Sequence, residues 1–306
     1  MQQAPVIEIR LLDMSNILIL GGTGMLGSAV TKSFSDWSGK VFVSSRAEQP
    51  AFLESQQSWL KFDAAKDHDL RALDGVPKID FVVNCIGVIK PYILDSDASK
   101  RANAIQVNTL FPQSLESWAS RNGARVIQIA TDCVFSGRRG MYLESDPYDA
   151  TDVYGKTKSL GEVPSASMMH LRASIIGPEV GRSTSLLEWV RKQPKGAKIP
   201  GYNNHFWNGV TATHFASVTK VIISSNFFKA GVQHLVPADE LSKYELVSAI
   251  AQHFGREDLE IESVESGSPV NRTLDTEFQD INLLLWKEAG YATPPSISQM
   301  ISELPR

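Results

Sequence analysis

The stretch ILILGGTGMLGSAV, residues 17–30, restricts the fold more than any other part of the 306-residue chain. A short apolar strand leads into Gly21, Gly24 and Gly27, spaced three apart, and a helical pattern begins at once. The first glycine permits a tight turn, the second lets the backbone approach a pyrophosphate, and the third lets helix and strand pack closely. Glycines also serve ordinary turns, but this strand–loop–helix context is the one that dinucleotide binding requires. The sequence therefore predicts a dinucleotide site.

The first half of the chain alternates apolar strands with helical patterns, which predicts an α/β fold with a doubly wound parallel (Rossmann) sheet. The expected strands are short and apolar on both faces, as buried parallel strands are: Asn16–Leu20, Lys40–Ser44, Ile79–Cys85, Arg125–Ala130 and Met169–Ala173. The expected helices between them are Leu26–Trp37, Ala98–Arg121 and Val153–Ser165.

After about Gly177 the pattern loosens into loops and shorter helices, expected at Thr213–Phe228, Ser242–Phe254 and Gln279–Ala289. We interpret this part as a smaller C-terminal α/β substrate lobe. The predicted division is an N-terminal extension at 1–13, an NAD(P)-binding domain at 14–177 and the lobe at 178–306, with exchange of chain between the last two left open. Met14 is an alternative start, since the first convincing strand follows it directly.

Composition excludes several classes of protein. A net charge of -4 and a pI of about 5.9 give no footprint for nucleic acid, and no apolar run approaches the ~20 residues that span a bilayer. Residues 1–13 lack the features of a signal peptide. Two cysteines cannot form a disulfide framework, which predicts a cytoplasmic location. Six scattered histidines without paired Cys/His spacing lead us to expect no metal.

The end of the second expected strand bears on the choice of cofactor. Sites that prefer NAD place Asp or Glu there to hold the ribose 2′-hydroxyl. This chain has VFVSSRAE, so Ser44, Ser45 and Arg46 occupy the region. A guanidinium with two hydroxyls suits a 2′-phosphate better, although a strand-end arginine in solvent is the plain alternative. We therefore expect NADP(H), with NAD(H) as the alternative.

Further segments complete a recognisable series: NCIGVIKP (84–91), ATDCVFSG (130–137), VYGKTKSLGE (153–162), LRASIIGP (171–178) and NRTLDT (271–276). With the glycine loop, the chain resembles the extended short-chain dehydrogenase/reductase superfamily. Within it, the chain is most similar to the dTDP-4-dehydrorhamnose reductase family of nucleotide-sugar reductases. The resemblance covers nearly the whole chain from about Met14.

The resemblance implies a catalytic triad of Thr131, Tyr154 and Lys158. Residues four apart lie on one helix face, so Lys158 can hold the nicotinamide ribose beside the Tyr154 phenol. We expect its charge to lower the tyrosine pKa, normally near 10, so that Tyr154 can deliver a proton to a carbonyl oxygen that Thr131 orients. A solvated helix face is the plain alternative for such a pair. Among the 7 tyrosines, only Tyr154 has a lysine four residues later.

The resemblance also implies further contacts. The residues expected at the cofactor are Gly21, Thr23, Gly24, Met25, Leu26, Gly27, Ser45, Arg46, Asp63, Cys85, Ile86, Gly87, Tyr154, Lys158 and Ile175. Those expected at a nucleotide-sugar substrate are Lys90, Thr131, Asp132, Trp207, Asn208 and Arg272. Asp63 has an equal alternative as the N-cap of a helix over Lys66–Leu73. Asn108 resembles an asparagine that steadies the site from behind, or is simply exposed.

One departure concerns the substrate: Cys133 stands where this family commonly has an aromatic residue after the Thr-Asp pair. We interpret Cys133 as a small filler rather than a nucleophile. The expected reaction is NAD(P)H-dependent reduction of a 4-keto-deoxysugar carried by a nucleotide, in surface polysaccharide synthesis. Epimerase or dehydratase chemistry and a non-catalytic regulatory subunit are the alternatives, and a homodimer is left open.

Overall fold

A computed structural model describes residues 14–67, 69–179 and 184–306, so the expected extension at 1–13 lies outside the described residues. Its centre is a seven-stranded parallel sheet, in the order β11-β6-β5-β4-β1-β2-β3. The strands are β1 (Ile17–Leu20), β2 (Val41–Ser45), β3 (Gln57–Lys61), β4 (Phe81–Asn84), β5 (Arg125–Ala130), β6 (Met168–Arg172) and β11 (Gly231–His234). The predicted Rossmann architecture is confirmed.

The chain reverses its direction of progress across the sheet at β1. From β1 the strands run outward through β2 to β3, and β4 then returns to pair with the other side of β1. In open parallel sheets, ligands bind at the carboxyl ends of the strands at such a reversal. The glycine loop follows β1 at this point, so it lies where open parallel sheets bind their ligands.

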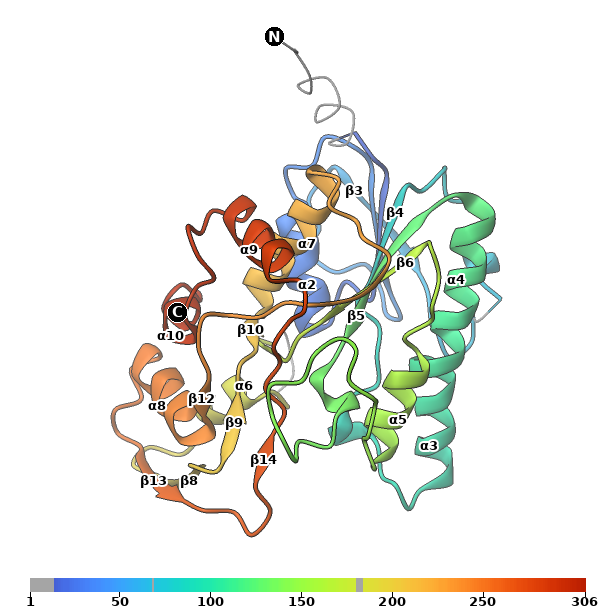
Figure 1. Cartoon of the computed structure of the whole chain (residues 1–306). Helices are drawn as coiled ribbons and strands as arrows, with labels where there is room; N and C mark the ends of the chain where they lie inside the picture. Colours follow the sequence, from blue (N-terminus) through green and yellow to red (C-terminus); the bar gives the residue numbers. More distant parts are fainter. Residues whose placement is uncertain (1–13, 68, 180–183) are drawn as a thin grey trace.

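Alternate residues of the strands face two separate cores. On one face, α2 (Met25–Ser33) and α7 (Ala212–Ser224) pack over Ile17 and Ile19. On the other, α4 (Phe111–Asn122) packs over Leu18 and Leu20. Figure 1 shows α3 (Ala98–Ile105), α4 and α5 (Val153–Leu160) on the side of the sheet away from α2 and α7. Both faces are thereby covered, which explains the continuous apolar character of β1 and β4.

The C-terminal half holds small sheets and short helices (Figure 1). Its helices are α6 (Leu186–Arg191), α8 (Lys243–His253), α9 (Gln279–Glu288) and α10 (Ile297–Ser302). The small sheets are β12-β9-β14 (Leu241–Ser242, His205–Trp207, Val270–Asn271), β13-β8 (Glu260–Val264, Lys198–Tyr202) and β10-β7 (Val210–Thr211, Ile175–Ile176). Two elements from beyond residue 178, α7 and β11, belong instead to the large sheet and its covering layer.

The expected helices occur, with shifted ends. The segment expected as one helix over Ala98–Arg121 is α3 and α4 joined by a π-helical turn, η3 (Gln106–Leu110). Such single π turns are rare and are found mostly at functional sites. The helix considered over Lys66–Leu73 is not what the structure shows: turns follow Asp63, and among the described residues of this segment the regular element is the 3-10 helix η1 (Arg71–Leu73).

Candidate functional site

The glycine loop has the steric requirements predicted for it. Gly21 has a φ of +77°, in the region that favours glycine. A Cβ at Gly27 would stand 2.1 Å from the Gly21 carbonyl oxygen, so only glycine allows α2 to start this close to β1. Gly24 is the N-cap of α2 and supplies no side-chain cap, which leaves backbone N–H groups there for a ligand.

Ser45 and Arg46 at the end of β2 differ in availability. The buried Ser45 hydroxyl donates to the Ala47 carbonyl (3.0 Å) and accepts from Trp59 Nε1 (2.9 Å), so it is already used within the protein. Arg46 is exposed and follows β2 directly. Asp63 uses Oδ1 to accept from the Ala65 N–H (3.1 Å), which caps a turn rather than a helix. Among Ser45, Arg46 and Asp63, the Arg46 side chain is therefore the freest to contact a 2′-phosphate.

The segment after β4 is fixed from behind by two asparagines. Asn84 donates to Gln128 Oε1 (2.7 Å) and accepts from the Ile86 N–H (3.1 Å). Asn108, in the π turn, is 2% exposed; it accepts from the Val88 N–H (2.8 Å) and donates to the Val88 carbonyl (2.9 Å). The exposed alternative for Asn108 is therefore wrong, and its amide holds the loop that contains Cys85, Ile86 and Gly87.

The three residues of the expected triad are brought together by α5 and the end of β5. Asp152 caps α5 by accepting from the Gly155 N–H (2.8 Å). A Cβ at Gly155 would lie 2.3 Å from the Cys133 carbonyl oxygen, so glycine lets the helix press against the segment that follows Thr131. The Thr131 hydroxyl lies beside the Tyr154 phenol and donates to Asp132 Oδ1 (3.1 Å). Lys158 Nζ donates to the Ile129 carbonyl (2.9 Å) and lies 4.0 Å from the Cβ position of Gly87.

The expected lowering of the Tyr154 pKa is wrong for the protein alone. Burial raises the pKa of Tyr154, the Cys133, Asp132 and Asp152 side chains add to the rise, and the neighbouring Thr131 hydroxyl opposes it. Burial also lowers the pKa of Lys158 to about 8. Helix spacing gives no measure of burial, which dominates the pKa of both groups. The phenol is consequently protonated at neutral pH.

Charged side chains from distant segments gather around Asp132. Lys90 pairs with Asp152 (2.7 Å), beside α5. Arg272 donates from Nε to the Phe135 carbonyl (2.8 Å), which leaves its two terminal nitrogens for other partners. Burial raises the pKa of Asp132, while the nearby positive charges of Arg272 and Lys243 oppose that rise.

Lys243 is a site residue that our reading of the sequence missed. It is the first residue of α8, its ammonium lies 5.6 Å from the centroid of the Trp207 ring, and no hydrogen bond or ion pair holds it within the described part of the chain. Burial lowers the pKa of Lys243, and the charge of Asp132 opposes the shift. The pairing of β12 and β14 with the two edges of β9 brings Lys243 and Arg272 to the same side chain cluster. No local motif marks this lysine.

The side chains of Trp207 and Asn208 are less available for contact with a substrate than we expected. Trp207 is 5% exposed and donates to Ser174 Oγ (2.7 Å). The Asn208 amide donates to the Leu274 carbonyl (2.7 Å) and accepts from the Leu274 N–H (2.9 Å). Both side chains therefore tie β9 and the following turn to neighbouring segments, and this geometry favours a supporting role over direct contact with a sugar.

The two thiols are not poised for nucleophilic chemistry. Burial raises the pKa of Cys85 and of Cys133 to about 12 in each case, so both are protonated at neutral pH.

Within the described residues, no group of three His, Cys, Asp or Glu side chains could hold a metal ion. No described helix is long and apolar enough to cross a bilayer.

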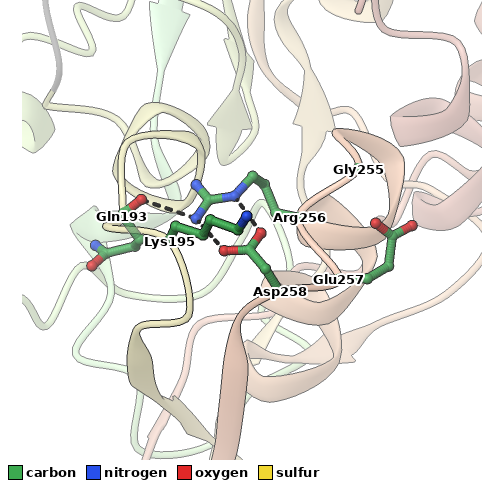
Figure 2. A pocket seen from close by; sticks show the side chains of 6 residues that line it. All are labelled: Gln193, Lys195, Gly255, Arg256, Glu257 and Asp258. Atoms are coloured by element: carbon green, nitrogen blue, oxygen red, sulfur yellow. Dashed lines mark hydrogen bonds and ion pairs between the residues drawn. The ribbon is translucent and has the colours of Figure 1, made fainter.

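An open surface hollow of about 510 Å³ lies elsewhere, between the ends of α6 and α8 (Figure 2). Arg256 lines it and donates to the carbonyls of Gln193 (2.9 Å) and Pro194 (3.2 Å) and to Asp258. Because this guanidinium is saturated by bonds that fasten the chain after α6, the hollow is a structural junction, distinct from the candidate site.

The family model of the RmlD substrate binding domain matches residues 14–276. The chain belongs to this family. It is 28% identical over 254 residues to methionine adenosyltransferase 2 subunit beta of Rattus norvegicus, covering 78% of this chain and 72% of that protein. It is 26% identical over 254 residues to a dTDP-4-dehydrorhamnose reductase of Aggregatibacter actinomycetemcomitans, covering 78% of each.

The fold of this RmlD-family chain also matches a solved structure, the dTDP-4-dehydrorhamnose reductase of Bacillus anthracis in complex with NADP. The TM-score is 0.73 at 15% identity, with 95% of this chain and 97% of that chain covered. The resemblance to this reductase family and to the extended short-chain dehydrogenase/reductase superfamily is thus confirmed.

Proposed function

We propose that the protein reduces the 4-keto group of a nucleotide-activated deoxysugar with NADPH. The observation that carries the proposal is the meeting of Thr131, Tyr154 and Lys158 beside the loop at Gly87, at the carboxyl ends of β4 and β5. The named reductases of the same family, one of them holding NADP, support the same reaction. The residues present fit a dinucleotide, because the glycine loop leaves backbone N–H groups and excludes any Cβ at Gly27.

The cofactor, when bound, supplies the hydride. This chain's residues manage the proton and the position of the carbonyl. The protonated Tyr154 phenol is the form that a proton donor needs, and the Thr131 hydroxyl orients the same oxygen. The Lys158 ammonium, near Gly87, is placed to hold the ribose and to stabilise the tyrosinate left after proton transfer.

The substrate side supports an anionic nucleotide sugar. Arg272 and Lys243 place two positive charges next to Asp132, and Lys90 lies close by on Asp152. A guanidinium fork and an ammonium suit the oxygens of a diphosphate. Exposed Arg46 favours NADPH over NADH. A role in surface polysaccharide synthesis and a cytoplasmic location stay predictions.

A second candidate is a subunit that binds the dinucleotide and a partner enzyme without turnover, which the likeness to a methionine adenosyltransferase subunit supports. Tyr154 and Lys158 weigh against it, since such a subunit has no chemical need of both. The deciding measurement is NADPH oxidation with a panel of nucleotide 4-ketosugars. Consumption of one NADPH per sugar is the expected result. Sugar conversion without net NADPH consumption indicates an epimerase or dehydratase, and cofactor binding without conversion of any sugar supports the subunit.

A further inference from the structure

A buried ion pair lies near Lys158 and has no role in the proposed reduction as described so far. Arg172 of β6 and Glu162, just beyond α5, have side chains that are 0% and 2% exposed. Arg172 donates to Glu162 from Nη2 and from Nε (3.3 Å), and the Tyr148 phenol donates to Glu162 Oε2 (2.7 Å). A carboxylate so deeply buried is costly unless it is paired, and this one is held from three directions.

Glu162 lies on the same side of α5 as Lys158. It is four residues further along, and its N–H continues the helical turn by donating to the Ser159 carbonyl (3.1 Å). The Lys158 ammonium donates to Ile129 of β5, and Arg172 belongs to the paired strand β6, where it faces Ala130. The ammonium and the ion pair therefore lie against the same two strands.

The Ile129 carbonyl is a neutral acceptor, so it cannot by itself offset the burial of an ammonium. Glu162 is the strongest influence that opposes burial and raises the pKa of Lys158, and the Cys133 side chain adds a smaller contribution. His170, on β6, also faces this region. Burial lowers the pKa of His170, and its Nε2 bonds the Val163 carbonyl (2.8 Å), so it is neutral near pH 7.

The far side of Arg172 is fixed as well. Nδ1 of His234 lies 2.6 Å from the Asp275 carbonyl and must carry the proton, so Nε2 accepts from Arg172 Nη1 (2.7 Å). Burial and the Arg172 charge lower the pKa of His234 to about 4. Arg172 therefore has a neutral neighbour on one side, and its charge is directed at Glu162.

We propose that Glu162 is a positioning residue, fixed by Arg172 and Tyr148, whose carboxylate keeps the Lys158 ammonium charged and in place. The consequence for cofactor and proton transfer rests on the proposed function, whereas the effect on the charge of Lys158 does not. Glu162→Gln keeps the shape of the side chain and removes its charge.

The test measures how trace acetylation of Lys158 by acetic anhydride depends on pH, with mass spectrometry as the readout. Lys156, exposed and two residues away, is the internal control. Removing an opposite charge lowers the pKa of a lysine, so the midpoint for Lys158 should fall by about one pH unit or more in Glu162→Gln. The Lys156 profile should be the same in both proteins. An unchanged Lys158 midpoint overturns the proposal.

Tyr148→Phe separates charge from packing, since it removes one hydrogen bond to Glu162 and keeps the carboxylate. It should lower the melting temperature and leave the Lys158 midpoint in place; a midpoint shift as large as that of Glu162→Gln would overturn the proposal. If Glu162→Gln does not fold, Glu162→Asp tests the proposal instead, because it keeps the carboxylate but shortens the side chain by one methylene. A downward shift of the Lys158 midpoint in Glu162→Asp supports the proposal, and the absence of any shift overturns it. Labelling needs neither cofactor nor sugar, so a failure of the reductase assignment appears only in the turnover assay.

Discussion

The cofactor side and the substrate side of the candidate site are formed by different kinds of chemical group. The cofactor side consists of backbone, glycines and neutral amides, with Lys158 as its one central charge. The substrate side consists of charged side chains that surround Asp132 and come from separate segments. A backbone site fixes geometry, whereas a charged site sets affinity for an anion. Changes to the fixed geometry of the first side should therefore act on turnover, and changes to exposed or clustered charges on binding.

Tyr154→Phe should give the largest effect and fall on turnover. Without a proton donor, kcat should drop by about 10²–10⁴. NADPH binding, measured by fluorescence titration, should stay nearly intact because the phenol is not part of the glycine loop. Wild-type turnover of the best ketosugar by this variant would remove the tyrosine from the reaction.

Arg272→Ala should instead raise KM. Losing a charged hydrogen bond costs about 1.5–3 kcal/mol, or roughly 10–150-fold in KM for the nucleotide sugar. The NADPH dissociation constant is the control and should barely change. A KM equal to that of the wild type would place the diphosphate elsewhere, and an equal fall in kcat would break the division between the two sides.

Arg46→Asp tests an exposed charge of the cofactor side. If its guanidinium meets the 2′-phosphate, a carboxylate there should weaken NADPH binding by roughly tenfold or more through like-charge repulsion. NADH binding should hold or improve. Titration of both cofactors against both proteins is the measurement, and an unaltered preference would falsify the role of Arg46.

Lys243→Met should give the smallest effect, and the two readouts should move in opposite directions. Affinity for a nucleoside diphosphate should fall by about two- to fivefold, as for a partly exposed ion pair. Stability should rise by about 0.3–1 kcal/mol, because a half-buried cation at the start of a helix opposes the helix dipole.

The expected rise in the melting temperature of Lys243→Met is the informative part, since a lysine kept for structure would lower it on removal. Lys195→Met, which removes an exposed charge from the turn that follows α6, controls for net charge. A lower melting temperature for Lys243→Met with unchanged affinity would assign Lys243 to the fold.

The difference between local patterns and contacts of distant segments explains what could be predicted from the sequence. The glycine loop and the Tyr154–Lys158 pair are local patterns, so both were recognised, as was the Rossmann fold. Two strands of the large sheet were missed: β3 is a half-exposed edge strand of mixed polarity, and β11 is a short GVQH segment far from its neighbours in the chain. Lys243 and the rise in the Tyr154 pKa depend on which distant segments meet and how deeply they are buried, and neither is written in local spacing.

The position of β11 has a consequence for synthesis of the chain. Every residue of β6 is buried, and β11 pairs with it from about 60 residues later. At a ribosomal rate of about 5–20 residues per second, β11 is made roughly 3–12 s after β6. During that interval the growing polypeptide carries an unpaired strand edge, which can pair with another nascent chain. The pairing of β11, the last strand to join the sheet, thus covers the exposed edge of β6.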